Sequence, residues 1–190
     1  MAARLKANGP SRRLKLTVTL FLLITLIGAS VFLAVGRASG FAAHPGIFGA
    51  RAKLFSDLNL IAQIVLLLGL GLGAVFARRG NIARHQYNQT GWVLFNIVLT
   101  IFIMVVAYFE YVLPGLPGNL GQAYSLVSTL HAILGFLTIL SGVYLILHMN
   151  QLIPEKWRVN WWKRLMKLTL VLYLLVGVFG LGIYYFGYVR

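Results

Sequence analysis

The chain has no cysteine and very few acidic residues. With no Cys among its 190 residues, disulfides, thiolate metal sites, iron–sulfur clusters and covalent haem attachment through a CxxCH motif are excluded. Any bound metal or haem must therefore use His, Met or oxygen ligands. Asp and Glu together number 3, against 17 Lys and Arg. Charged residues make up only 11% of the chain, whereas soluble domains carry about 25% with balanced signs.

What the chain has in abundance is apolar side chains. Hydrophobic residues make up 59% of the sequence, and the formal net charge is +14. A disordered basic tail lacks such apolar content, and a basic nucleic-acid-binding protein does not consist mostly of Leu, Ile, Val and Phe. The composition therefore predicts an integral membrane protein with no nucleic-acid partner, surrounded by the lipid bilayer.

Five apolar stretches are long enough to cross a bilayer as helices, which takes about 20 residues each. All 5 prolines lie outside these stretches or at their ends, as expected of residues that interrupt helices. We therefore predict an all-α integral membrane bundle of five transmembrane helices, forming one domain over residues 16–190 after a basic tail, 1–15. The predicted spans are 16–35, 57–76, 91–113, 122–149 and 165–188.

The first apolar stretch, 16–35, has a second interpretation. Basic residues precede it and small residues follow it, as in a secretory signal peptide. The apolar core of a signal peptide is only about 7–15 residues long, however. The length of 16–35 favours a retained helix, with cleavage as the alternative.

The basic residues predict the orientation of the helices. Most of the 17 Lys and Arg lie in the N-terminal tail, in the loop after the second span, and in the segment that enters the fifth span. These three regions share one side of the membrane, and basic loops mark the cytoplasmic side. All 4 Trp fall on that boundary too. We therefore predict a multi-pass plasma-membrane protein with a cytoplasmic N-terminus and an external C-terminus.

Small residues predict where the helices pack against one another. Lipid gives helices no hydrophobic drive to associate, so transmembrane helices meet through small side chains. Three of the spans carry such glycines. They are Gly69, Gly71 and Gly73 in 57–76, Gly135 and Gly142 in 122–149, and Gly177, Gly180 and Gly182 in 165–188.

His131 is the strongest candidate for a functional side chain. It lies nine residues into the span 122–149, in the external half of an apolar helix. Ionisable groups within a membrane are costly, so each is a functional candidate. A neutral imidazole can ligate a metal or haem iron. The alternative is a hydrogen bond to a neighbouring helix.

Further polar residues are predicted at the same external face. Glu110 lies near the end of the third span, Asp57 opens the second span, and His44 lies in the loop before it. Together with His131 they predict a candidate metal site of His and carboxylate ligands. The alternative is helix capping and hydrogen bonding between helices, since an Asp at a helix N-terminus complements the helix dipole.

Two other histidines are predicted near the cytoplasmic face. His148 ends the fourth span, and His85 lies in the loop before the third span. A haem held between two histidines could form there, although either side chain could simply be solvated. Met104 lies at about the depth of His131 in the third span, which permits a His/Met pair. A Met in an apolar helix more often serves packing.

Common catalytic motifs are absent from the sequence. It contains no HExxH, P-loop or dinucleotide fingerprint, and no Ser/His/Asp set of suitable spacing. No span has a central Pro or a midplane charge, which a transporter with broken helices would show. These observations disfavour an enzyme or a transporter and identify no soluble small-molecule substrate.

The region from Asp57 onward resembles the YozB-like family of small bacterial membrane proteins. The resemblance covers about two-thirds of the chain. It rests on Leu58-Asn59, the loop RRGNIARH ending at His85, Tyr108, the segment YSLVSTLHAIL carrying His131, and the closing GIYY.

The resemblance implies a function and candidate ligands. Some members of this family are associated with the maturation of haem–copper oxidases, and the matching positions here are His85 and His131. The family also tends to have a His late in its third helix and another before its last helix. This chain reads AYFEYVLP and EKWRVNWW there, with Glu110 but no His.

We therefore expect a non-enzymatic accessory or assembly protein of a respiratory or related electron-transfer complex. It would bind haem b or copper through His131 with His85, Glu110 or His148, and its partners would be other membrane subunits. One alternative is a purely structural subunit of a larger membrane complex without a cofactor. A further alternative is a small redox protein similar to a b-type cytochrome.

Overall fold

The computed structural model of the chain describes residues 54–189 and, before them, positions 20, 24, 28, 45–48 and 52. The predicted first span, 16–35, lies outside the described residues except for the three helical positions 20, 24 and 28, and so does His44. The described chain is all-α, as predicted. Its principal helices are α3 (Leu54–Arg78), α4 (Ile82–Leu99), α6 (Ala123–Met149) and α7 (Trp162–Tyr184).

Four helices of the described chain are long and apolar enough to cross a membrane. They cover Ser56–Arg78, Ile82–Gly115, Ala123–Met149 and Trp162–Val189. These correspond to the second to fifth predicted spans, and they indicate a multi-pass membrane protein. The second of them extends α4 through α5 (Val105–Ala107). The extension also contains two π-helical segments, Thr100–Met104 and Tyr108–Val112, and a final turn at Leu113–Gly115.

The start of α4 differs from the sequence prediction. We expected the span to begin at residue 91 and His85 to lie in a loop, but the helix already begins at Ile82. The backbone turns at Gly80, which has a positive φ of 73°, a conformation that glycine adopts at no steric cost. Asn81 then caps α4, its side chain accepting a hydrogen bond from the Arg84 N–H at 3.2 Å. The polar stretch after it is therefore helical.

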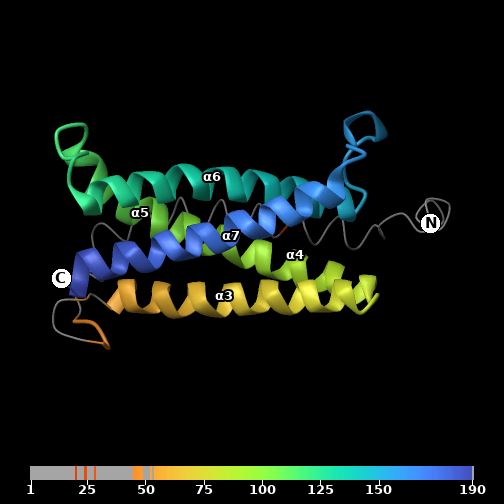
Figure 1. Cartoon of the computed structure of the whole chain (residues 1–190), viewed down its shortest axis with the longest axis horizontal. Helices are drawn as coiled ribbons and strands as arrows, with labels where there is room; N and C mark the ends of the chain where they lie inside the picture. The colour runs from red at the N-terminus through yellow and green to blue at the C-terminus, as the bar shows by residue number, and fades with distance from the viewer. Residues whose placement is uncertain are drawn as a thin grey trace.

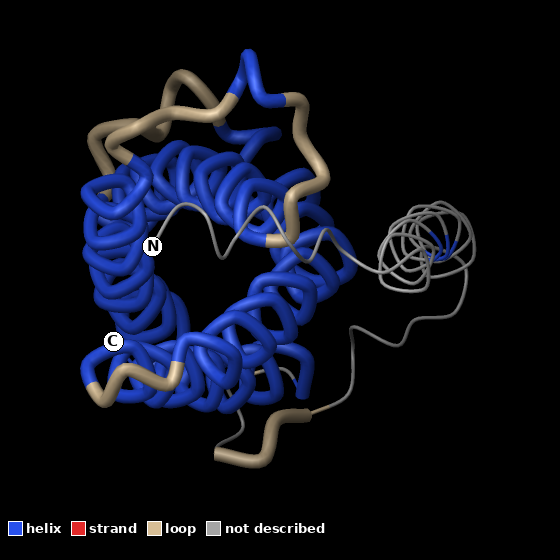
Figure 2. Tube along the Cα trace, turned by 90° about the vertical axis from the view of Figure 1, so that its right-hand side faces the viewer, coloured by secondary structure: helices blue, strands red, loops and turns tan. Residues whose placement is uncertain are grey.

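The four long helices form a closed bundle. Figure 1 shows α3, α4, α6 and α7 lying side by side along the long axis. Figure 2, turned by 90°, shows them as a ring. Helix α3 packs on α4 and α7, and α6 packs on α4 and α7. One end of the bundle carries the α3–α4 turn and the α6–α7 connection, and we call it the Gly80 end. The opposite end carries the connection between Gly115 and α6, and we call it the Pro117 end.

The packing is apolar inside and apolar outside. The buried core consists of side chains from all four helices: Leu66, Leu70, Val93, Ile97, Ile146 and Tyr173. On the outer faces Leu68 is 70% exposed, Phe136 62% and Val178 65%. Large apolar side chains exposed all around a bundle suit hydrocarbon rather than water, since a soluble protein rarely exposes such extensive apolar patches. The bilayer is therefore the medium that fits this surface.

The predicted packing role of the glycines is confirmed at some positions. A Cβ placed on Gly69 would lie 2.0 Å from the Trp92 ring, and one on Gly177 would lie 2.5 Å from Leu67. An added Cβ would also be crowded at Gly73 and Gly142, whereas at Gly180 and Gly182 it would make only ordinary van der Waals contact. Gly71 and Gly135 have open space where a Cβ would be, so the prediction is wrong for these two. Gly71 is two residues, about 200° of helix, away from Gly69.

The contrast between Gly69 and Gly71 gives a paired test. In Gly69→Ala the added methyl group meets the Trp92 ring, so α3 and α4 must separate. We expect the free energy of unfolding to fall by about 1–3 kcal/mol, the usual cost of overpacking. Thermal unfolding of the detergent-solubilised chain measures the change. Gly71→Ala is the control and should be neutral or slightly stabilising, because Ala has the higher helix propensity. Equal losses in both variants would contradict the packing described here.

Candidate functional site

The contact between α3 and α4 contains a row of hydrogen bonds from side chains to backbone. Asn88 Nδ2 donates to the carbonyl oxygen of Gly69 at 2.8 Å, and Gln89 Nε2 donates to that of Leu70 at 3.1 Å. The Asn88 side chain also accepts a hydrogen bond from the Trp92 indole at 3.3 Å. Polar side chains within a membrane need such partners, because neither lipid nor bulk water supplies them.

His85 continues this row and extends it to a third helix. Its ring Nδ1 lies 2.8 Å from the carbonyl oxygen of Gly73 on α3, and its Nε2 lies 3.3 Å from Met166 Sδ on α7. The side chain is only 4% exposed. The sequence interpretation of a solvated loop residue is therefore corrected: His85 is buried where α3, α4 and α7 meet.

The carbonyl of Gly73 determines the protonation of the His85 ring. A carbonyl oxygen only accepts hydrogen bonds, so the nitrogen 2.8 Å from it, Nδ1, must carry the proton. In the neutral ring Nε2 then holds a lone pair, and this lone pair faces the sulfur of Met166. A histidine whose other nitrogen donates to a backbone carbonyl is the arrangement found at metal-binding histidines.

His131 links α6 to α7. Its Nδ1 lies 3.0 Å from the carbonyl oxygen of Val176 and donates to it. The ring also packs against Gly180, where an added Cβ would lie 3.4 Å from His131 Cε1. This is the hydrogen bond to a neighbouring helix named above as the alternative to ligation. The Nδ1 of His131 is engaged, and its ring is held against α7.

The structure does not bring His131 and His85 together. Their partners on α7 are Val176 and Met166, ten residues apart along the helix. This separation corresponds to about 15 Å at the helical rise. Two nitrogen ligands of one metal ion each lie only about 2 Å from it. A single ion or haem iron between these two histidines does not fit this arrangement.

His148 lies at the Gly80 end, in a stack of aromatic side chains. Its ring centroid is 5.9 Å from that of Tyr144 and 5.7 Å from that of Trp162. Trp162 precedes Met166 by four residues, so it lies one turn away on the same face of α7. His85 and His148 thus pack against consecutive turns of α7: His85 contacts Met166, and His148 contacts Trp162.

Asp57 is a fully buried junction at the Pro117 end. It has 0% exposure, and its carboxylate accepts hydrogen bonds from the Phe48 N–H at 2.8 Å and the Tyr184 hydroxyl at 2.7 Å. It therefore ties the segment before α3 to the end of α7. Glu110 is exposed on the π-helical segment Tyr108–Val112. Within the described part of the chain, His, Asp and Glu form no group of three that could hold a metal ion.

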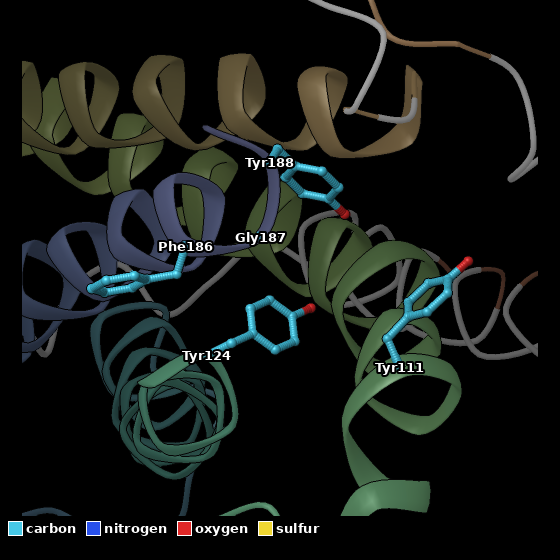
Figure 3. Close-up of a pocket in the computed structure, with 5 residues that line it drawn as sticks. All are labelled: Tyr111, Tyr124, Phe186, Gly187 and Tyr188. Atoms are coloured by element: carbon cyan, nitrogen blue, oxygen red, sulfur yellow. The ribbon is translucent and has the colours of Figure 1, made fainter. Parts of the chain in front are cut away.

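A cavity of about 430 Å³ opens at the same end of the bundle. Figure 3 shows Tyr124 reaching from α6 between Tyr188 and Tyr111. Tyr188 is fixed by the Ser56 hydroxyl, which donates to its phenol oxygen. No sequence pattern predicted this cavity, because its tyrosines come from separate parts of the chain. The lining residues are Tyr111, Tyr124, Phe186, Gly187 and Tyr188.

Comparison with known proteins found no relative of this chain. No protein-family model, no curated protein and no solved structure matches the chain. Its contacts and composition therefore define its class, a helical multi-pass membrane protein.

The buried carboxylate of Asp57 predicts a large effect on stability. Asp57→Ala leaves the Phe48 N–H and the Tyr184 hydroxyl without their acceptor, and buried groups left unpaired cost about 1–3 kcal/mol each. We expect the free energy of unfolding to fall by about 3 kcal/mol, measured by thermal or denaturant unfolding in detergent. Glu110→Ala removes an exposed carboxylate instead and should change stability by less than about 0.5 kcal/mol. An unchanged free energy of unfolding in Asp57→Ala would contradict the stabilising role given to these hydrogen bonds.

Proposed function

We propose that this chain is a non-enzymatic accessory or assembly protein of a respiratory or related electron-transfer complex. Its place is the plasma membrane, and its partners are other membrane subunits. The observation that carries the proposal is the burial and fixed orientation of the His85 ring. This histidine ends the stretch RRGNIARH, on which the resemblance to the YozB-like family rests most specifically, and it is buried and oriented by the Gly73 carbonyl.

The arrangement of the other polar side chains supports a scaffold rather than a catalyst. Asn88, Gln89 and His131 each donate to a backbone carbonyl of a neighbouring helix. Side chains used in this way hold helices together. Of the two cofactors expected from the sequence, copper at His85 alone fits the distance between His85 and His131 better than a haem shared by both.

The proposed orientation has five spans, with the N-terminus in the cytoplasm and the C-terminus outside. The basic side chains of the described helices gather at the Gly80 end, together with the aromatic rings of Trp157, Trp161 and Trp162. Basic residues next to transmembrane helices mark the cytoplasmic side. This end therefore faces the cytoplasm in our proposal. The basic residues concerned are Arg78, Arg79, Arg84, Lys156, Arg158, Lys163, Arg164 and Lys167.

A purely structural subunit without a cofactor is the second candidate. The observation that favours it is His131, whose Nδ1 is engaged with the Val176 carbonyl. In that case His85 would be one more tie between helices. The two candidates differ in whether His85 is needed for the function of the complex or only for the stability of the bundle.

Loss of the chain tests the proposed function. Cells lacking it should lose the haem–copper oxidase signal in a reduced-minus-oxidised spectrum of their membranes, while other membrane cytochromes remain. Complementation with the unaltered chain should restore that signal, and complementation with His85→Ala should not. His131→Asn is the matched control and should restore the signal, because it changes a histidine of α6 whose partner on α7, Val176, lies about 15 Å from the partner of His85.

The protein level of each variant in the membrane is measured by immunoblot, so that a folding defect is recognised. Membranes with an unchanged oxidase spectrum in the absence of the chain would contradict the proposal. Full function of a stably expressed His85→Ala variant would favour the structural subunit.

A further inference from the structure

The contact between His85 and Met166 is unusual in its chemistry. Nδ1 donates to the Gly73 carbonyl, so the neutral ring presents a lone pair at Nε2. That lone pair faces the thioether of Met166 at 3.3 Å, and the sulfur offers only lone pairs in return. Two electron-pair donors therefore point at each other in a site where His85 is 4% exposed. A positive species between them would make this contact favourable.

We infer that His85 Nε2 and Met166 Sδ are the two protein ligands of a Cu(I) ion. The inference rests on the proposed function and deepens it, because it names the metal, its oxidation state and a ligand absent from the sequence expectations. Thioether and imidazole are soft and intermediate donors, a combination that selects Cu(I) over hard divalent cations. Hard cations prefer carboxylates, and the whole chain contains only 3 acidic residues.

The distance between the two donor atoms fits a bent metal site. With metal–nitrogen and metal–sulfur bonds of about 2.0 and 2.3 Å, a donor separation of 3.3 Å corresponds to an angle of about 100° at the metal. A haem iron between the same atoms would need them on opposite sides of the macrocycle, about 4.3 Å apart by the same bond lengths. The pair therefore fits a bare ion and does not fit haem.

A bent site with two protein ligands leaves coordination positions of Cu(I) that this pair does not fill. A third donor from another molecule can then bind before a protein ligand leaves, which is the geometry of ligand exchange. In such an exchange Cu(I) keeps its electrons and only changes donors. Because Nε2 carries no proton in this tautomer, the Cu–N bond forms without displacing one.

The surface around the site favours a negatively charged carrier of the metal. The end of α3 with the turn after it, the first turn of α4 and the start of α7 contribute six basic residues, and Glu155 is the only acidic residue at this end. Thiolate complexes of Cu(I) are anionic, so these basic residues attract them. The six residues are Arg78, Arg79, Arg84, Lys163, Arg164 and Lys167.

Competition for Cu(I) tests the inference. The full chain in detergent micelles is titrated without oxygen, in the presence of ascorbate, against the Cu(I) complex of bicinchoninate, whose colour reports the metal it retains. We expect one Cu(I) per chain. The affinity should fall by more than about tenfold in Met166→Leu and His85→Ala, since removing even a hydrogen-bond partner of a ligand can cost that much.

The variants separate a lost ligand from a lost fold. Met166→Leu conserves volume and is well tolerated in cores, so its folded state can be compared directly with the unaltered chain by circular dichroism. Met104→Leu and His131→Asn are the controls and should bind Cu(I) as the unaltered chain does. X-ray absorption of the loaded protein should show a sulfur neighbour that disappears in Met166→Leu.

Two results would overturn the inference: no Cu(I) bound in competition with the chelator, or equal binding by folded Met166→Leu. Either result would mean that the contact is an ordinary hydrogen bond, in which an N–H at His85 Nε2 donates to Met166 Sδ. Failure here is distinguishable from failure of the proposed function. Absent Cu(I) binding with a persisting oxidase defect would overturn only the Cu(I) site, whereas Cu(I) binding with an intact oxidase would overturn only the proposed function.

Discussion

The bundle is organised around the close approach of α3 and α4. Lipid gives these helices no hydrophobic reason to associate, so packing and hydrogen bonds must hold them together. Gly69 and Gly73 remove the side chains that would keep the helices apart. Asn88, Gln89 and His85 then reach the α3 backbone and donate to its carbonyls. Small residues on one helix and amides or imidazole on the other are both required.

The same polar turn of α4 also fixes the neighbouring helices. Gln86 on its other side donates to the carbonyl of Met149 and to the side chain of Asn150, and Asn150 donates to Thr90. The start of α4 is thereby bonded to α3 on one side and to the end of α6 on the other. This arrangement closes the bundle at the Gly80 end, and it places the His85 ring against α7.

Hydropathy was sufficient to predict four of the described spans, because length and apolar content determine what can cross a bilayer. It failed at the start of α4, where the polar residues of RHQYNQT resembled a loop. Their partners are backbone carbonyls of α3 and groups at the end of α6, which no sequence pattern displays. His131 was found as a polar residue in an apolar helix, but its partner is again a carbonyl. Met166 was missed, because a methionine among apolar residues gives no signal of what it faces.

The Gly73 carbonyl fixes the His85 ring and leaves Nε2 as an electron-pair donor toward Met166. Nitrogen-15 NMR of the histidine side chains can observe this tautomer, because the chain has only 4 His and His85→Gln assigns the signal. We expect a proton on Nδ1 and a bare Nε2 in the neutral ring, and the Nε2 resonance should shift when Ag(I), a redox-inert substitute for Cu(I), is added. A neutral ring with its proton on Nε2 and no response to Ag(I) would contradict it.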